Sequence, residues 1–314
     1  MKVIWNYAAG PEFRRRLDDL ARRDLEVAVC PEADDERLFD LLADAEVLWH
    51  CLRPVDARVL RAAPRLRLVQ KIGVGVNTID LAAARARGVA VCNMPGTNSR
   101  AVAEQTLALM LAVLRQLPRF DADVRRGRGW SWDADRQQGL GEIAGRTVGL
   151  VGFGAIPRVL APILGAMGAR VLYTARSPKE AGLAEYRRLE ELLRDADIVS
   201  LHVPLTAETH RMLDRTRFRL MKPGAVLVNT ARGGLVDQDA LLEALEEGRL
   251  TGAGLDVFPA EPLPPDHPLL RREDLVLCPH VAWLTGETLT RSLTVAVENC
   301  RRLDSGEALL HRVE

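Results

Sequence analysis

The sequence lacks two features that would each point to a class of partner. Its 43 Lys and Arg residues equal its 43 Asp and Glu residues, so the formal net charge is +0. Proteins that bind nucleic acid gain much of their affinity by neutralising phosphates with excess positive charge, so we expect no nucleic-acid partner. The longest apolar stretch, residues 106–114, is shorter than the roughly 20 residues that a helix needs to cross a bilayer. We therefore expect no membrane partner.

The sequence also lacks paired cysteines. There is no CxxC motif, and no cysteine stands at a metal-ligand spacing from a histidine, which predicts that the protein has no metal site. Single cysteines of this kind are typical of reduced, mostly buried thiols in cytoplasmic proteins. The first 13 residues contain an apolar strand but no signal-peptide pattern, and we expect a cytoplasmic location. The cysteines are Cys30, Cys51, Cys92, Cys278 and Cys300.

What the sequence does have is an ordinary globular composition over 314 residues, with 47% hydrophobic and 27% charged residues. This length is sufficient for two domains of ordinary size. Strand-like runs alternate with helical patterns along the chain, which predicts parallel sheets covered by helices on both faces. The expected helices include residues 35–42, 57–62, 81–87, 185–194, 239–247 and 288–303, and a long helix over 101–117 that Pro118 ends.

Residues 147–176 carry the most informative local pattern, TVGLVGFGAIPRVLAPILGAMGARVLYTAR. An apolar strand meets the turn Gly152-Phe153-Gly154, and a helix and a second strand follow. This βαβ order carries a dinucleotide fingerprint, in which glycines let the backbone approach a pyrophosphate. The amides of Ala155 and Ile156 would help to hold that anion at the helix start. Pro157 replaces the usual third glycine, and proline is tolerated in the first turn of a helix.

The end of the second strand indicates which nicotinamide cofactor is preferred. NAD sites of this fold place Asp or Glu there to bind the ribose 2′-hydroxyl, but this chain has Ala175 followed by Arg176. The change removes repulsion of a 2′-phosphate, and Arg176 adds a charge-assisted partner, with Thr174 and Ser177 as further donors. We therefore predict that NADP(H) is preferred and that NAD(H) is possible. The alternative is that Arg176 is only an exposed charge.

A second glycine-containing loop, KIGVGVNTID over residues 71–80, follows an expected strand. Ligands of open α/β sheets bind at the carboxyl ends of the strands, and the amides of this loop could hold an anion there. The alternative is a tight connection between a strand and a helix.

Several longer motifs together resemble the D-isomer-specific 2-hydroxyacid dehydrogenase family. They are IGVGVNTIDLAAARARGVAVCNMPGTNSRAVAEQTLALML, VGLVGFGAIP, DIVSLHVPLTAETHRMLD, MKPGAVLVNTARGGLVDQDAL, AGLDVFPAEPLPPDHPLL and LCPHVA. The resemblance implies two doubly wound parallel-sheet α/β domains, with a Rossmann cofactor domain inserted into a flavodoxin-like substrate domain. The expected boundaries are 1–98 plus 283–314 for the substrate (catalytic) domain and 99–282 for the dinucleotide-binding domain.

Three positions match the catalytic residues of that family: Arg232 in NTARGG, Glu261 in PAEP and His280 in CPH. Reduction of a 2-oxo acid needs a cation for the carboxylate and a proton for the developing alkoxide. Arginine offers a planar fork that binds a carboxylate bidentately. A histidine paired with a carboxylate can donate the proton.

The resemblance also assigns further contacts. The backbone amides of Val74 and Gly75 would bind the substrate carboxylate, and Trp283 is a candidate wall of the substrate pocket. The remaining histidines are expected to be surface or structural residues, except His202, which is expected to line the cofactor site. The expected cofactor contacts are Thr106, Gly152, Gly154, Ala155, Ile156, Thr174, Arg176, Ser177, His202, Val203, Pro204, Thr230, Ala231 and Asp256.

The implied activity is that of an NAD(P)-dependent D-2-hydroxyacid dehydrogenase. The pattern is closest to NADP-using glyoxylate and hydroxypyruvate reductases, so the expected partner is a small 2-oxo or 2-hydroxy acid. Oxidation of 3-phosphoglycerate is the nearest alternative within the family, and a dinucleotide-binding corepressor-like module is the alternative outside catalysis. The resemblance further implies a homodimer, formed through the cofactor domain and the arm around Trp130, which lies in a polar segment, residues 121–141, that also contains Trp132.

Overall fold

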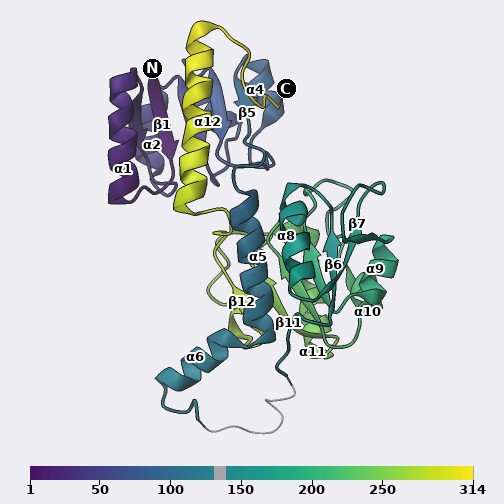
Figure 1. Cartoon of the computed structure of the whole chain (residues 1–314). Coiled ribbons are helices and arrows are strands. Elements are labelled where there is room, and N and C mark those ends of the chain that lie inside the picture. Colours follow the sequence, from purple (N-terminus) through teal and green to yellow (C-terminus); the bar gives the residue numbers. More distant parts are fainter. Residues whose placement is uncertain (131–138, 314) are drawn as a thin grey trace. The chain divides into compact units, whose positions relative to one another are not determined.

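The computed structural model describes residues 1–130 and 139–313, and Trp132 lies outside them. The chain forms two compact units (Figure 1). Unit 1 combines Met1–Asn98 with Thr285–Glu314, and unit 2 is the intervening segment Ser99–Leu284. Among the described residues, no helix is long and apolar enough to cross a membrane.

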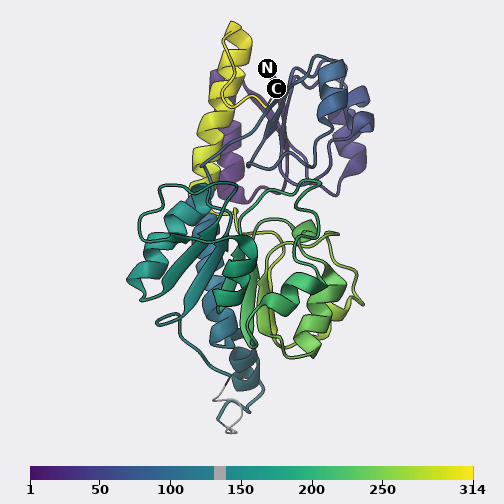
Figure 2. The ribbon, with the colours of Figure 1, turned by 90° about the vertical axis from the view of Figure 1, so that its right-hand side faces the viewer.

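Unit 1 is built on a five-stranded parallel sheet with the order β2-β1-β3-β4-β5, which is the flavodoxin-like order. Helices α1 and α12 lie side by side on one face of it (Figures 1 and 2), where Arg16 Nη1 donates to Thr290 Oγ1 at 2.9 Å. Helices α2 and α3 pack their apolar side chains into the core on the other face. The elements are β1 (Lys2–Asn6), α1 (Pro11–Asp18), β2 (Glu26–Val29), α2 (Asp35–Leu42), β3 (Val47–His50), α3 (Ala57–Ala62), β4 (Leu68–Lys71), α4 (Leu81–Ala86), β5 (Ala90–Cys92) and α12 (Gly286–Ser305), with a 3₁₀ helix at Asp19–Arg23.

Unit 2 is built on a seven-stranded parallel sheet with the order β12-β11-β10-β9-β6-β7-β8. The strand order runs outward in both directions from β6, as in a Rossmann fold, and such folds bind ligands where the order reverses. Its elements are α5 (Ser99–Leu114), α6 (Leu117–Arg125), β6 (Thr147–Val151), α8 (Ala155–Ala166), β7 (Arg170–Thr174), β8 (Glu185–Tyr186), α9 (Leu189–Asp195), β9 (Ile198–Leu201), α10 (Arg215–Leu220), β10 (Ala225–Asn229), α11 (Gln238–Glu246), β11 (Leu250–Leu255) and β12 (Leu275–Leu277), with 3₁₀ helices at Gly233–Leu235 and Pro268–Arg271.

Two apolar layers enclose the sheet of unit 2. Helices α5 and α8 supply one layer, which includes Met110 and Leu160. Helices α9, α10 and α11 supply the other, which includes Leu192, Phe218 and Leu241. Because both faces are covered, the strands are buried along almost their whole length. The prediction of two doubly wound parallel-sheet domains is therefore confirmed.

Two expected helices differ from the observed ones. The helix expected over 101–117 ends at Leu114, where Gln116 adopts a left-handed φ of 48° and a second helix, α6, begins. Pro118 lies in the first turn of α6, because a proline lacks only an amide that would have no intrahelical partner there. The helix expected over 185–194 is a short strand, β8, followed by α9, whose first turn is closed by Arg188 and Glu191.

Candidate active site

The predicted pyrophosphate site lies between β6 and α8. Gly152 has a φ of +100°, and a Cβ added to it would stand 2.5 Å from the His202 carbonyl oxygen, so the turn requires glycine. Gly154 caps α8 from an exposed position with no atom within 4 Å of an added Cβ. No side chain caps the helix, so the first amides of α8, at Ala155 and Ile156, remain available to an anion. A dinucleotide pyrophosphate fits this arrangement.

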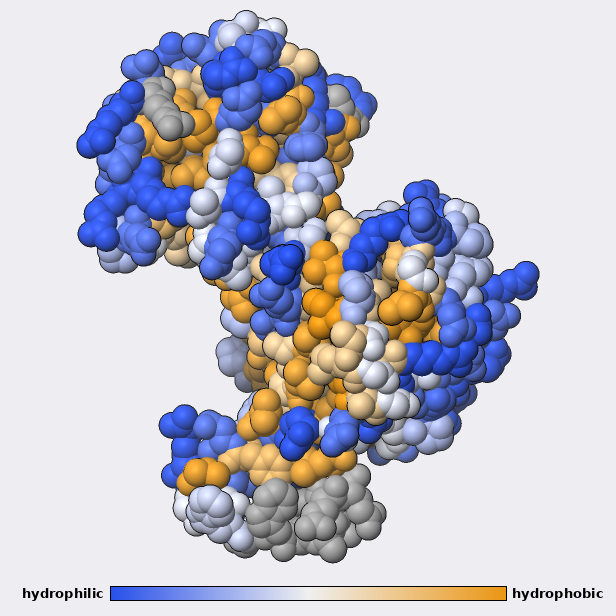
Figure 3. All heavy atoms as spheres, in the orientation of Figure 1, coloured by the Kyte–Doolittle hydropathy of each residue, from blue (hydrophilic) through white to orange (hydrophobic). Residues whose placement is uncertain are grey.

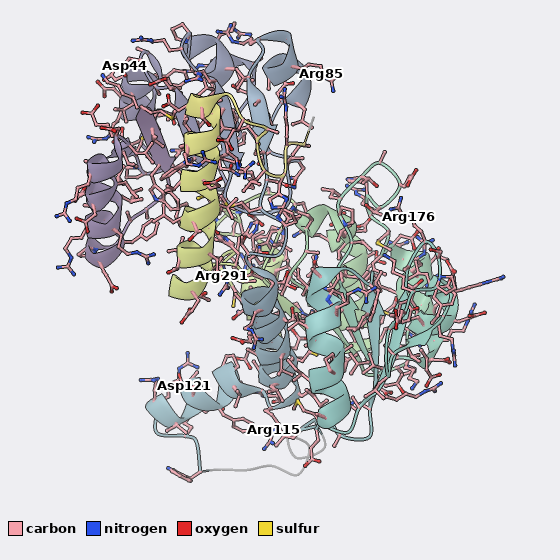
Figure 4. The ribbon with its side chains drawn as sticks, turned by 45° about the horizontal axis from the view of Figure 1, so that its top comes forward. Asp44, Arg85, Arg115, Asp121, Arg176 and Arg291 are labelled. Atoms are coloured by element: carbon pink, nitrogen blue, oxygen red, sulfur yellow. The ribbon has the colours of Figure 1, made fainter. Side chains whose placement is uncertain are left out.

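The end of β7 lies next to this turn. The Gly152 amide donates to the Thr174 carbonyl at 2.9 Å, which joins the glycine turn to the strand that precedes Arg176. Thr174 and Ala175 are half-buried, whereas Arg176 and Ser177 are exposed. Figure 4 labels the side chain of Arg176 on unit 2. The structure thus brings the predicted 2′-phosphate residues to the same edge of the sheet as the predicted pyrophosphate site.

The end of β9 lies on the other side of the glycine turn. The His202 amide donates to the Val151 carbonyl at 2.7 Å, and Ser200 Oγ lies 2.9 Å from His202 Nε2. Burial lowers the pKa of His202 to about 3, so its ring is neutral at neutral pH. Val203 is half-buried and Pro204 is exposed. The predicted contacts 202–204 therefore border the glycine turn.

Arg232 stands on the loop that follows β10. The buried side chain of Asn229 holds this loop, because its Oδ1 accepts from the Ala231 amide at 3.0 Å and its Nδ2 donates to the Arg232 carbonyl at 2.9 Å. Arg232 itself is half-buried, and its Nη1 donates to the Ala231 carbonyl at 2.6 Å. Burial lowers the pKa of the guanidinium and the carboxylate of Glu261 raises it, with a net lowering. Arginine remains charged under such conditions.

The loop of Arg232 packs directly on the loop that leads to Glu261. A Cβ added to Gly233 would stand 1.9 Å from the Phe258 carbonyl carbon, so the two backbones are in contact there. The Phe258 amide in turn donates to Glu261 Oε1 at 2.8 Å. Backbone contacts thus fix the spacing between two of the predicted catalytic residues.

Glu261 and His280 form a direct pair. Glu261 Oε2 lies 2.7 Å from His280 Nδ1, and 32% and 20% of the two side chains, respectively, are exposed. Burial alone would raise the pKa of Glu261, but the hydrogen bond to His280 and the charges of His280 and Arg232 lower it overall. Glu261 is therefore a carboxylate at neutral pH, and it holds the Nδ1 side of the imidazole ring.

His280 has a left-handed backbone with a φ of 57°, which is uncommon for residues other than glycine. Asp256 holds the chain in this conformation. Its carbonyl accepts from the His280 amide at 2.8 Å, and its two carboxylate oxygens accept from the amides of Val281 and Ala282 at 2.9 Å each. Burial raises the pKa of Asp256. The hydrogen bonds from these two amides lower it, but the net change is upward. Its predicted contact with the cofactor stays a prediction.

Three other predicted residues, Thr106, Thr230 and Trp283, are buried. The Thr106 hydroxyl donates to the Val102 carbonyl at 2.7 Å and lies 2.8 Å from the hydroxyl of Thr230. Thr106 is 0% exposed, so this placement does not favour its predicted contact with a cofactor phosphate, which stays a prediction. Trp283 is 7% exposed and donates through Nε1 to the His280 carbonyl at 3.1 Å. Ala231 is half-buried beside Arg232.

Val74 and Gly75 belong to unit 1, whereas all the other predicted site residues belong to unit 2. They lie on the loop after β4, at the carboxyl edge of the sheet. Val74 is 45% exposed, and its carbonyl accepts from Asn93 Nδ2 at 2.9 Å. This bond orients the loop and leaves its predicted amide contacts to be tested.

Sequence reasoning did not single out Asn229 or Ser200, which hold Arg232 and His202 in place. The available signal was their position, because each is a polar residue in one of the last two positions of an apolar strand. A buried polar side chain at such a place needs a partner, and the adjacent loop supplies it. Within the described ranges, no group of three or more His, Cys, Asp or Glu residues could hold a metal ion.

Comparisons with known proteins bear on this site. The sequence model of the D-isomer specific 2-hydroxyacid dehydrogenase NAD binding domain matches residues 107–282. A glyoxylate reductase of Korarchaeum cryptofilum is 42% identical over 281 residues, which are 87% of this chain and 81% of that protein. A D-3-phosphoglycerate dehydrogenase of Mycobacterium bovis is 39% identical over 304 residues, which are 96% of this chain but 54% of that protein.

The fold has a close counterpart among solved structures. A crystal structure of a protein from Thermus thermophilus superposes with a TM-score of 0.90 and 41% sequence identity, with 100% of both chains covered. The chain therefore belongs to the D-isomer-specific 2-hydroxyacid dehydrogenase family, whose members are NAD(P)-dependent oxidoreductases that act on small 2-oxo and 2-hydroxy acids.

Proposed function

We propose that this protein reduces a small 2-oxo acid, of the glyoxylate or hydroxypyruvate type, to its D-2-hydroxy acid, with NADP(H) as the preferred cofactor. The observation that carries the proposal is the pairing of His280 with Glu261 at 2.7 Å, on a loop whose backbone contacts that of Arg232. A cation for a carboxylate and a proton donor are thus held in one unit. The 42% identity to a glyoxylate reductase supports the substrate class.

Each of the three residues has a separate role in this proposal. The guanidinium of Arg232 binds the substrate carboxylate through two N–H groups. His280 donates a proton from Nε2 to the substrate 2-oxo oxygen, while Glu261 accepts from Nδ1–H and stabilises the charged ring. A bound nicotinamide supplies or accepts the hydride.

The cofactor preference rests on the end of β7. Arg176 and Ser177 are exposed there, and Ala175 stands where a carboxylate would repel a 2′-phosphate. In this proposal the pyrophosphate lies on the first amides of α8, and residues 202–204, Thr230 and Ala231 border the nicotinamide ribose. Unit 2 is then the cofactor domain and unit 1 the substrate domain.

We further propose a homodimer formed through the outer face of unit 2. Apolar side chains gather on the face that α5 and α6 form (Figure 3), and Leu117, Val124 and Trp130 are 54%, 51% and 86% exposed. Exposed apolar clusters of this kind are typical of protein interfaces.

The five cysteines are free thiols, which is compatible with a reducing cytoplasm.

A substrate panel with both cofactors tests the proposal. We expect NADPH to be oxidised with glyoxylate and hydroxypyruvate, with a kcat/KM above that for NADH by roughly tenfold or more, the size expected for one charge-assisted bond. Arg176→Ala should reduce that ratio towards one. Equal ratios in the wild type and in the variant would reject the cofactor assignment.

Oxidation of 3-phosphoglycerate is the second candidate, and the 39% identity to a D-3-phosphoglycerate dehydrogenase favours it. The same panel separates the two if it includes 3-phosphohydroxypyruvate. A kcat/KM for that substrate well above those for glyoxylate and hydroxypyruvate would select this candidate. Dinucleotide binding without turnover of any 2-oxo acid would instead favour the corepressor-like module.

A further inference from the structure

The loop that carries Arg176 is exposed, yet it is anchored at both ends. Residues 176–180 lie on the surface of unit 2, in the connection between β7 and β8. At its start, the Thr174 carbonyl accepts from the Gly152 amide at 2.9 Å, so the loop begins in a fixed relation to the glycine turn. An exposed connection would otherwise be free to adopt many conformations.

At its far end, the same loop is held by one buried hydroxyl. Tyr173 Oη accepts from the Lys179 amide at 2.7 Å and donates to the Lys179 carbonyl at 2.8 Å. Tyr173 is the last residue but one of β7 and is 1% exposed. A single side chain therefore closes the segment 174–179 by binding both backbone groups of one loop residue.

The position of this hydroxyl is fixed by the packing of its ring. The Tyr173 ring lies 4.3 Å from the ring of Phe153, within the glycine turn, and 5.6 Å from the ring of Tyr186 on β8. Arg158 on α8 adds a second anchor, because its Nη1 donates to the Glu180 carbonyl at 2.9 Å and its Cζ lies 5.3 Å from the Phe153 ring centre. Both anchors, Tyr173 and Arg158, therefore pack against Phe153 in the predicted pyrophosphate turn.

We propose that Tyr173 is a positioning residue for cofactor specificity, which holds the loop of Arg176 and Ser177 in the conformation that receives the 2′-phosphate of NADP. The inference rests on the proposed preference for NADP(H). Binding a phosphate with an exposed arginine loses conformational entropy when the loop is ordered, and a loop that is already closed loses less. The hydroxyl of Tyr173 thus acts through Arg176 and does not touch the cofactor.

Tyr173→Phe is the direct test, because it removes the hydroxyl and keeps the packed ring. We expect the KM for NADPH to rise about threefold to tenfold, as for one or two ordinary hydrogen bonds, with little change in kcat. The KM for NADH should not change, since NADH has no 2′-phosphate.

Tyr186→Phe is the matched control, because the Tyr186 hydroxyl makes no hydrogen bond with this loop in the described structure. It should leave both KM values unchanged.

A double-mutant cycle with Arg176→Ala shows whether Tyr173 acts through Arg176. In the Arg176→Ala background, Tyr173→Phe should no longer change the KM for NADPH, because the group that it positions is absent. Two results would overturn the inference. One is that Tyr173→Phe raises the KM for NADPH in the Arg176→Ala background as much as in the wild type, and the other is that it raises the KM values for NADPH and NADH equally. If Tyr173→Phe does not fold, Arg158→Met loosens the same loop from α8 and should raise the KM for NADPH selectively. An unchanged KM in that variant would also overturn the inference.

The outcomes distinguish this inference from the proposed function. A wild-type protein with no preference for NADPH would reject the cofactor assignment itself. A wild type that prefers NADPH through Arg176, with a Tyr173→Phe variant that folds and keeps the same NADPH and NADH constants, would reject only the role of Tyr173.

Discussion

At the scale of single residues, the site depends on groups whose surroundings set their state. Glu261 carries a lowered pKa because His280 and Arg232 offset its burial, so it is ionised where the imidazole needs a partner. The Phe258 amide occupies its other oxygen, which leaves one oxygen for the ring. The geometry thus suits a histidine that donates its proton from the opposite nitrogen.

His280→Gln tests this role. Glutamine can keep a hydrogen bond but cannot transfer a proton at neutral pH, so kcat should fall about 10²-fold to 10⁴-fold. The KM for NADPH should change little, since the ring lies on a different loop from the glycine turn. His210→Gln, at an exposed position in the same unit, is the control. A kcat within a factor of a few of the wild type would reject the proton-donor role.

Arg232→Lys tests recognition of the carboxylate separately from charge. Lysine keeps the positive charge but loses the planar fork, so kcat/KM for the 2-oxo acid should fall roughly tenfold to a hundredfold, the range for a lost charge-assisted hydrogen bond. Steady-state kinetics with glyoxylate and hydroxypyruvate measure the loss. Full activity in the lysine variant would mean that the fork makes no contact with substrate.

At the scale of elements, helices that begin at a capping residue could be predicted from the sequence better than connections. The helices expected over 35–42 and 57–62 have the observed bounds, and each follows an aspartate, Asp34 or Asp56, whose side chain accepts from an amide of the first turn. Helix α6 and strand β8 were missed, because Pro118 can start a helix as well as follow one, and because two strand residues, Glu185 and Tyr186, show no periodicity. The clamp of Tyr173 on Lys179 could not be predicted, since it depends on how the loop folds back in space.

The glycine turn between β6 and α8 contains two glycines, Gly152 and Gly154, whose substitution by alanine should have different effects. Gly152→Ala should lower the affinity for NADPH and the melting temperature, because the added Cβ would meet the His202 carbonyl at 2.5 Å at a φ of +100°. Strain of this kind costs about 1–3 kcal/mol, or several degrees in melting temperature. Gly154→Ala should have the same melting temperature as the wild type, since nothing lies within 4 Å of its added Cβ. Similar melting temperatures for both variants would contradict the assignment of strain to Gly152.

At the scale of the whole molecule, each unit carries a histidine near the carboxyl edge of its sheet whose ring is kept neutral by its surroundings. His202 in unit 2 has a pKa of about 3 because of burial. His50 in unit 1 is 0% exposed, and burial together with the charge of Lys71 lowers its pKa well below the ordinary value. Both rings are neutral in the folded protein, and both would gain a proton in the unfolded chain at mildly acidic pH. Acid should therefore destabilise both units.

The contribution of His50 can be isolated with His50→Gln. Because the folded pKa lies below that of the unfolded chain, near 6.5, the unfolded state binds more protons as the pH falls below that value, and stability is lost. The wild type should therefore lose about 5 °C more in melting temperature than His50→Gln between pH 7.5 and pH 5. Glutamine can still bond to Thr78, whose Oγ1 lies 2.9 Å from His50 Nε2, so the variant should fold. His210→Gln should follow the wild type, because its ring is exposed. Parallel melting curves for all three proteins across this pH range would show that His50 is not protonated on unfolding.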